Sequence, residues 1–279
     1  QLKGVQHIQA TEFAFAAILE DGSVVTWGDA DCGGDSSAVH EQLKGVKQIQ
    51  ATETAFAAIL EDGSVITWGD ADFGGDSSAV RDQLKGVQQI HASVHGFAAI
   101  LEDGSVVTWG DVSFGGDSSR VREQLKGVKQ IQATDKAFAA ILEDGSVVTW
   151  GHVGFGGDSS AVRDQLRGVQ QIHATDKAFA AILEDGSVVT WGRACFGGDR
   201  SAFRDQLRGV QQIQTSLGAF AEILEDGSVV TWGRKNYGGD SSEVRDQLRG
   251  VQQIQASFGA FSAILEDGSV VTWGHAGFG

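Results

Sequence analysis

The sequence contains no proline and no methionine, and it uses asparagine and tyrosine once each, as Asn236 and Tyr237. Such narrow usage of residue types is unusual for a globular chain of 279 residues. It indicates either that one short unit was duplicated recently or that the chain was designed around a consensus. The sequence does not separate these two origins.

Long apolar runs are also missing. No stretch approaches the roughly 20 apolar residues that a membrane-spanning helix needs, and no signal-peptide pattern is present. We therefore expect no membrane partner. The first residue, Gln1, already lies inside a repeat, so a leader could have been removed, and no cellular location follows from the sequence.

The seven tryptophans recur at a constant interval, and a fixed interval of this size is the mark of a repeat protein. Each follows the previous one by 41 residues. They are Trp27, Trp68, Trp109, Trp150, Trp191, Trp232 and Trp273. Seven full units would need 287 residues, and the eight missing ones fall at the seam between the two ends of the chain.

One unit predicts a sheet of three or four short antiparallel strands. The segments 46–51, 55–60 and 64–68 are the three strands, and the second of them is apolar throughout, as in a strand buried on both faces. Asp62-Gly63 predicts a two-residue hairpin turn. Residues 80–84 are a candidate outer strand, and no helix of ordinary length fits the unit.

This pattern predicts an all-β fold, a seven-bladed β-propeller of 41-residue repeats closed into a ring with adjacent termini. We expect one domain over residues 1–279. Its blades would span about 1–41, 42–82, 83–123, 124–164, 165–205, 206–246 and 247–279.

The repeated phrase resembles that of the regulator-of-chromosome-condensation (RCC1) propellers. One copy reads Gly86-Val87-Gln88-Gln89-Ile90, then Leu101-Glu102-Asp103-Gly104 through Trp109-Gly110, then Phe114-Gly115. It is most similar to the bacterial β-lactamase-inhibitor propeller of that superfamily. Two departures from the family pattern weaken the inference that this chain shares the function of that family. Phe56 and Phe97 stand where the family has His, and Thr52 and Ser93 stand where it has Gly.

Differences among the seven copies concentrate in two windows. The first loop lies between the first and second strands, and its two variable residues include Glu12-Phe13, Glu53-Thr54 and Val94-His95. The second loop follows each Trp-Gly pair. Because strand direction alternates, both loops should emerge on one face, opposite the invariant Asp-Gly turns. Variable loops on a rigid scaffold are typical of a recognition surface, although unconstrained loops also drift.

The net charge is −16, and the charges at the variable positions are segregated. The acidic ones fall in the first three blades: Glu12, Asp29, Asp31, Glu53, Asp70, Asp72 and Asp111. The basic ones fall in the next three: Lys136, Lys177, Arg193, Arg200, Arg234 and Lys235. A polarised face of this kind could steer a complementary protein, or it could pair with a second copy of itself.

An aromatic residue follows five places after nearly every tryptophan. These residues are Phe73, Phe114, Phe155, Phe196, Tyr237 and Phe278, with Cys32 as the exception. They are either an apolar contact surface or filler beneath the second loops. Two histidines, His95 and His152, lie in the variable loops and complete the predicted partner-binding set.

The residues that carry enzyme chemistry do not converge in this sequence. The histidines lack metal-ligand spacing, and no nucleophile elbow, phosphate loop or dinucleotide fingerprint is present. Cys32 and Cys195 belong to blades that are not neighbours, so a disulfide is not expected. Glu222 replaces an alanine of the apolar strand and could project into a wet central channel. We expect no enzyme activity, no metal and no cofactor.

The sequence therefore predicts a non-catalytic module that binds a protein through the variable face. The alternative is a structural or self-assembling, homodimeric repeat scaffold without a foreign ligand. An acidic chain without a basic tail does not favour nucleic acid. The near-uniform units leave no room for the insertion that nucleotide exchange on a GTPase requires in this family.

Overall fold

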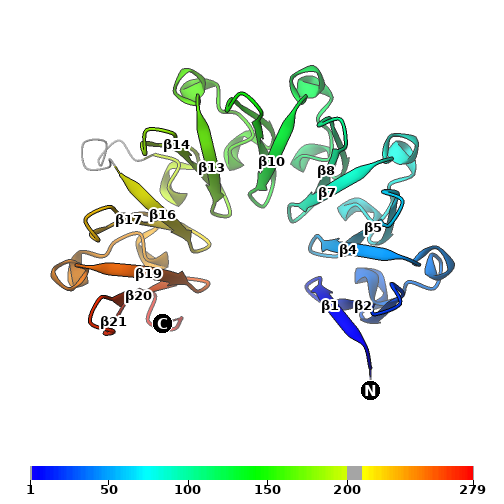
Figure 1. The fold of residues 1–279 in the computed structure, drawn as a ribbon, viewed down its shortest axis with the longest axis horizontal. Helices are drawn as coiled ribbons and strands as arrows, with labels where there is room; N and C mark the ends of the chain where they lie inside the picture. Colours follow the sequence, from blue (N-terminus) through cyan, green and yellow to red (C-terminus); the bar gives the residue numbers. More distant parts are fainter. Residues whose placement is uncertain (1, 200–208, 279) are drawn as a thin grey trace. The chain divides into compact units, whose positions relative to one another are not determined.

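The computed structural model describes residues 2–199 and 209–278. Its contacts group the chain into two compact units. Unit 1 comprises residues 1–142 with 150–152, and unit 2 comprises residues 143–149 with 153–279. Within each unit, successive repeats lie side by side in sequence order. Figure 1 shows this for β4 (Val46–Ala51) beside β7 (Val87–Ala92) and for β16 (Val210–Thr215) beside β19 (Val251–Ala256).

Each repeat forms one three-stranded antiparallel sheet, here called a blade. The first strands are β1 Val5–Ala10, β4 Val46–Ala51, β7 Val87–Ala92, β10 Val128–Ala133, β13 Val169–Ala174, β16 Val210–Thr215 and β19 Val251–Ala256. The second strands are β2 Ala14–Leu19, β5 Ala55–Leu60, β8 Gly96–Leu101, β11 Ala137–Leu142, β14 Ala178–Leu183, β17 Ala219–Leu224 and β20 Ala260–Leu265. The third strands are β3 Val24–Gly28, β6 Val65–Gly69, β9 Val106–Gly110, β12 Val147–Gly151, β15 Val188–Gly192, β18 Val229–Gly233 and β21 Val270–Gly274.

The prediction of an outer strand at residues 80–84 was wrong, because this segment belongs to a short 3-10 helix and the residue after it. In the second blade the helix is η4, Ser78–Gln83, and Val80 N donates to Ser77 O over 3.0 Å. The same helix recurs as η6 Ser119–Gln124, η8 Ser160–Gln165 and η12 Ser242–Gln247. Leu84, directly after η4, is buried and ties the segment to the core. A blade therefore has three strands.

The hairpin turn holds three residues, not the predicted two. Leu60 N donates to Ser64 O over 2.9 Å, which leaves Glu61, Asp62 and Gly63 in the loop. Gly63 has a φ of 76°, a value that favours glycine. The Asp62 carboxylate accepts from the amide and hydroxyl of Ser64 over 2.9 and 2.6 Å. These bonds hold the pKa of Asp62 below its usual value.

The core lies between neighbouring blades. Small and branched side chains of β2, such as Ala14, Ala16 and Ile18, pack against Ile49 and Phe56 of the next blade. The Phe56 ring also stacks on Trp68 of its own blade, with ring centroids 5.2 Å apart. This stacking explains why phenylalanine occupies the position where the resembling family has histidine.

A hydrogen bond joins each pair of consecutive blades near this core. Trp68 Nε1 donates to Gly33 O of the preceding blade over 3.0 Å, and Trp191 Nε1 donates to Gly156 O over 3.0 Å. The glycine is required for close approach. A Cβ on Gly74 would lie 2.7 Å from a ring carbon of Phe97, and its φ is 96°.

The first and last blades each leave one apolar face uncovered. Phe15 of the first blade is 43% exposed, whereas the equivalent Phe56 is fully buried. Val270 of the last blade is 59% exposed, whereas the equivalent Val65 is 7% exposed. The closed ring and the single domain stay predictions from the sequence.

Glu222 does not project into water, contrary to the expectation from the sequence. It is fully buried in β17, paired in register with Ile213 and Val230. Among the described residues, no helix is long and apolar enough to cross a membrane.

Candidate protein-binding face

The two variable loops of a blade lie at the same end of its sheet, as predicted. Asp70 N, at the start of a second loop, donates to Thr54 O of the first loop over 3.0 Å. The Asp-Gly turns lie at the other end, where Glu61 N donates to Gly45 O over 2.9 Å. We call the end that carries the variable loops the loop face.

Backbone hydrogen bonds link the first loops of successive blades. In unit 1, Glu12 N donates to Glu53 O, Glu53 N to Val94 O and Val94 N to Asp135 O, over 2.9–3.1 Å. In unit 2, Asp176 N donates to Leu217 O over 3.0 Å. The residues that vary in side chain therefore share a fixed backbone, which preorganises the loop face.

Buried hydroxyl groups anchor the second loops to the sheets. Thr52 accepts from Ala55 N and donates to Phe73 O, over 3.0 Å in each case. Thr175 and Ser216 donate in the same way to Phe196 O and Tyr237 O, over 3.1 and 2.7 Å. This bond is the physical reason for Thr or Ser where the resembling family has Gly.

The aromatic residues of the second loops form ladders with the variable residues of the first loops. In unit 1, the His95 ring lies 4.8 Å from the Phe73 ring and 4.7 Å from the Phe114 ring. Lys136 Nζ lies 4.0 Å from the Phe114 centroid, and the His152 ring lies 6.0 Å from it. The aromatics are thus neither fully exposed nor mere filler, because their faces hold the variable side chains.

The ladder of unit 2 carries cations. Lys177 Nζ lies 5.2 Å from the Phe155 centroid and 4.8 Å from the Phe196 centroid. In the sixth blade the first loop has Gly218 at the position equivalent to Lys177. The Arg234 side chain occupies the space beside it. Its guanidinium carbon lies 5.0 Å from the Phe196 centroid and 4.7 Å from the Tyr237 centroid. A Cβ on Gly218 would meet Arg234 Cδ at 3.1 Å, so glycine at this position makes room for the arginine.

Three predicted acidic residues have a structural role in the second loop. The carboxylates of Asp29, Asp70 and Asp111 accept from the backbone amides two residues on, over 3.0, 2.9 and 2.8 Å. These bonds cap the helical turns η1 Ala30–Gly34, η3 Ala71–Phe73 and η5 Val112–Phe114. Arg193 and Arg234 hold the same position before η9 Ala194–Phe196 and η11 Lys235–Tyr237, without a side-chain cap.

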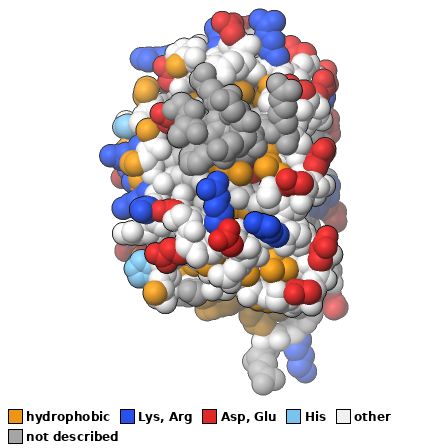
Figure 2. All heavy atoms as spheres, turned by 90° about the vertical axis from the view of Figure 1, so that its left-hand side faces the viewer, with side chains coloured by type: hydrophobic (Ala, Val, Ile, Leu, Met, Phe, Trp, Pro, Cys, Tyr) orange, Lys and Arg blue, Asp and Glu red, His pale blue; other side chains and the backbone are white. Residues whose placement is uncertain are grey.

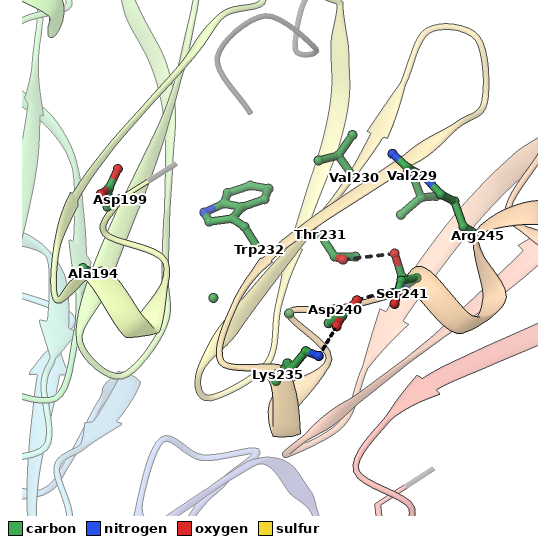
Figure 3. A pocket seen from close by; sticks show the side chains of 13 residues that line it. Ala194, Asp199, Val229, Val230, Thr231, Trp232, Lys235, Asp240, Ser241 and Arg245 are labelled. Carbon is green, nitrogen blue, oxygen red and sulfur yellow. Dashed lines mark hydrogen bonds and ion pairs between the residues drawn. The ribbon is translucent and has the colours of Figure 1, made fainter. Parts of the chain in front are cut away.

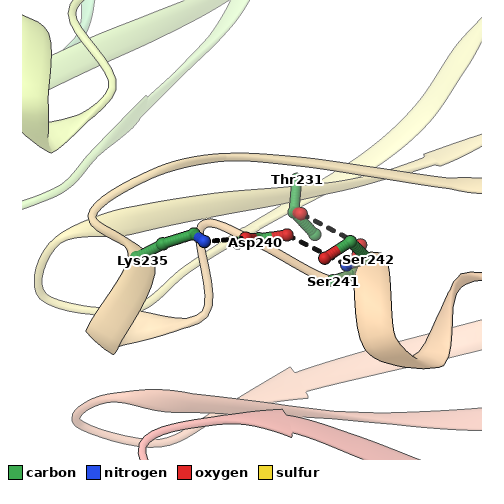
Figure 4. Close-up of polar contacts among 5 residues, drawn as sticks. All are labelled: Thr231, Lys235, Asp240, Ser241 and Ser242. Atoms are coloured by element: carbon green, nitrogen blue, oxygen red, sulfur yellow. Dashed lines mark hydrogen bonds and ion pairs between the residues drawn. The ribbon is translucent and has the colours of Figure 1, made fainter.

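Lys235 is paired with a carboxylate of its own blade. Its Nζ lies 2.8 Å from Asp240 Oδ2, and Ser242 N donates to Asp240 Oδ1 over 3.0 Å (Figure 4). The lysine and Ser242 lower the pKa of Asp240 to about 2. Lys235 therefore offers less free charge to a partner than the two arginines do.

The predicted loop-face charges are mostly acidic in unit 1, which also carries Lys136, and are basic in unit 2. In unit 1, desolvation and the nearby Asp29, Asp31, Asp70 and Glu12 raise the pKa of the Cys32 thiol, which shows how closely these carboxylates gather. In unit 2, Lys177, Arg193 and Arg234 gather around Phe196. Figure 2, which looks at the side of β16–β21, shows Lys, Arg and His with some carboxylates along one edge and mainly carboxylates along the other. Arg200, also predicted in the basic set, lies outside the described residues.

A pocket of about 510 Å³ borders β18 and is lined by Thr231, Trp232, Lys235, Asp240 and Arg245 among others (Figure 3). In other blades this side of the third strand contacts a 3-10 helix, as η8 contacts β15 and η12 contacts β21. The corresponding segment here, 200–208, lies outside the described residues. The pocket is therefore not a candidate ligand site.

The search for a metal site covers the described ranges, 2–199 and 209–278. No group of three or more His, Cys, Asp or Glu is placed there to hold a metal ion. The two ladders and the capping role of the aspartates were missed by sequence reasoning. Their signal in the sequence was the occurrence of Gly218 together with Arg234 in one repeat, and the recurrence of Asp directly after the Trp-Gly pair in the first three repeats.

No protein-family model matches the sequence, and no curated protein matches it. Solved structures are similar in fold. Prp20p from Saccharomyces cerevisiae, studied for its binding to Gsp1p and histones, matches at a TM-score of 0.50 and 18% identity, over 83% of this chain and 72% of that chain. A chain from the structure of Kap60 bound to yeast RCC1 (Prp20) matches at 0.53 and 17%, over 93% and 79%. The designed protein Ika8 matches at 0.44 and 14%, over 96% and 83%.

Identities this low establish the fold and not the function. The seven three-stranded sheets and the similarity to RCC1 structures confirm the predicted all-β propeller of 41-residue repeats. The finer resemblance to the bacterial inhibitor stays a prediction. The chain has a β-propeller fold similar to that of the RCC1 (Prp20) structures.

Proposed function

We propose that this protein is a non-catalytic binding module that holds another protein on its loop face. The observation that carries the proposal is that aromatic rings of the second loops alternate with variable side chains in a ladder within each unit. Sequence variation is concentrated in side chains that project from a hydrogen-bonded backbone, and these side chains stack on aromatic rings. A rigid framework with variable, aromatic-rich contact residues is the usual composition of a protein interface.

The predicted contact residues fall into two groups on this face. Exposed residues available for contact include Glu12, Phe13, Asp31, Asp72, His152, Arg193 and Arg234. Residues that also order the face include Asp29, Asp70, Asp111 and the half-buried aromatics. The first group should supply most of the specificity, because its side chains are exposed on the loop face.

The test compares a variant with charge changes on the loop face and a variant with the same types of change at framework positions. The immobilised protein is exposed to an extract, and retained proteins are identified by mass spectrometry and then purified for direct binding. Charge changes on the loop face, such as Arg193→Gln with Asp72→Asn, should abolish binding of a genuine partner. The same types of change at framework positions, Arg163→Gln with Asp103→Asn, should leave it intact. Equal loss in both variants would refute the proposal.

Self-association is the second candidate, because the predicted loop-face charges are mostly acidic in unit 1 and basic in unit 2. A second copy could then serve as the partner. Light scattering behind size exclusion at low and high salt distinguishes the two. A dimer at low salt that dissociates at high salt supports self-pairing, since salt screens exposed charges. A monomer in both conditions leaves the loop face free for a foreign protein.

A further inference from the structure

Three cations surround one aromatic ring on the loop face of unit 2. Lys177 Nζ, Arg234 Cζ and Arg193 Cζ lie 4.8, 5.0 and 5.9 Å from the centroid of the Phe196 ring. The ring itself is 6% exposed, whereas both arginines are exposed. The ring and the loop backbone beneath it therefore hold the charged groups together at the surface.

These cations lack an acidic partner in the part of the chain that the structure describes. Within residues 2–199 and 209–278, Lys177, Arg193 and Arg234 make no ion pair. Lys235 of the same loop, in contrast, is paired with Asp240. Like charges at this spacing repel one another, so an anion that bridges them would relieve the repulsion.

The two arginines also replace a residue that stabilises the loop. Blades 1–3 have aspartate at this position, and its carboxylate caps the following turn. Arg193 and Arg234 leave that turn without a side-chain cap. A substitution that gives up a local hydrogen bond for an exposed charge is typical of a functional position.

We propose that Lys177, Arg193 and Arg234 form a receptor for a carboxylate-rich segment of a partner protein. This inference rests on the proposed function and names the chemistry of the partner. A guanidinium that stacks on a ring keeps the N–H groups of its edge free, and these can donate a pair of hydrogen bonds to one carboxylate. Glutamate or aspartate side chains spaced along an extended segment would engage the three cations in turn.

A nucleic acid fits this surface less well. Proteins hold single-stranded bases by stacking them on open aromatic faces, but the rings of this ladder already carry cations. Phe196 is largely buried beneath three of them.

The experiment measures the anisotropy of a fluorescein-labelled peptide of alternating Glu and Gly during titration with the full chain. A peptide with Gln in place of Glu is the probe control. The variant Arg193→Gln with Arg234→Gln removes two charges of the receptor. Its matched control, Arg163→Gln with Arg245→Gln, removes two exposed framework arginines of the same unit. Circular dichroism and thermal melting verify that both variants fold.

We expect the Glu peptide to bind, the Gln peptide not to bind, and the receptor variant to weaken binding about tenfold or more. The matched control should bind like the original chain. Equal weakening in both variants would overturn the receptor, because it would indicate general charge attraction. Tighter binding of an oligothymidylate than of the Glu peptide would overturn the choice of a protein segment.

The same variants separate this inference from the proposed function. If a partner protein depends on the loop face but the Glu peptide does not bind, the receptor is wrong and the binding module stands. If the Glu peptide binds as expected but capture of proteins is insensitive to the loop face, the proposed function fails instead.

Discussion

The indole nitrogen of Trp109 donates to the carbonyl oxygen of Gly74 in the preceding blade, over 3.1 Å. The bond crosses the apolar interface between two sheets and is buried. It repeats with the same geometry from Trp150 to Gly115 and from Trp232 to Gly197. Six of the seven tryptophans, all except Trp27, therefore connect neighbouring blades by a hydrogen bond and also belong to the buried core.

Removal of this donor should destabilise the chain. Trp109→Phe leaves the Gly74 oxygen buried without its partner, at a cost of about 1–3 kcal/mol beyond the lost packing. Urea unfolding followed by circular dichroism measures the change. The exposed substitution Gln88→Ala, on the first strand of the same blade, is the control and should change the midpoint little. A midpoint unchanged by Trp109→Phe would contradict the role of the bond.

Restoring the missing cap in the fifth blade should stabilise it. Arg193→Asp reproduces the residue that caps η3 and η5 in other blades, and we expect a gain of about 1 kcal/mol. Arg193→Ala, which removes the charge without adding a cap, separates the two effects. Denaturant midpoints provide the measurement, and a midpoint for Arg193→Asp below that of Arg193→Ala would show that the aspartates are not stabilising caps.

The pair of Lys235 and Asp240 should contribute stability that depends on pH. The pKa of Asp240 is about 2 in the folded chain, below the value near 3.9 of an unfolded aspartate. Stability from this group is thus fully present above about pH 4 and is lost as the pH falls toward 2. Comparison of urea midpoints over this range for the original chain and Asp240→Asn tests the effect, which should be smaller in the variant. If the urea midpoints of the two proteins changed with pH in parallel, the pair would make no pH-dependent contribution to stability.

His95 should titrate below the ordinary histidine range. Burial between two rings lowers its pKa, and Lys136 lowers it further, whereas Asp111 raises it. A histidine with a lowered folded pKa contributes stability that is fully present above its unfolded pKa, near 6.5, and is lost as the pH falls from there through the lower folded pKa. NMR titration of the ring protons should show the pKa of His95 rising in Lys136→Gln. No rise would mean that the two side chains are not neighbours in solution.

The exposed face of the first blade offers a test of the ring predicted from the sequence. Phe56→Ala should cost about 3–5 kcal/mol, since Phe56 is fully buried. Closure of the ring would cover Phe15 as well, and Phe15→Ala should then cost a similar amount. A cost near zero for Phe15→Ala would indicate that this face stays uncovered in solution. Unfolding in urea measures both variants under identical conditions.

The positions of the strands could be predicted because each depends on local pattern and on a repeat seen seven times. The apolar run of Ala55–Leu60 and the glycine at Gly63 place a buried strand and its turn without knowledge of the rest. The segment at 80–84 was mistaken for a strand because its apolar residues, Val80 and Leu84 at the two ends, do not distinguish a strand from the short 3-10 helix that forms there. A short segment holds too few residues to separate the two periods.

The sequence predicted which end of the sheets carries the loop face, but it did not predict how the side chains of that face are arranged. Alternating strand direction places both variable loops at one end, so the sequence by itself determined the fold class, the repeat and the end of the sheet that varies. Only the tertiary structure decided that Lys177 and Arg234, far apart in sequence, meet on one ring of Phe196. That meeting depends on the packing of neighbouring blades, and packing brings together residues whose spacing along the chain carries no local signal.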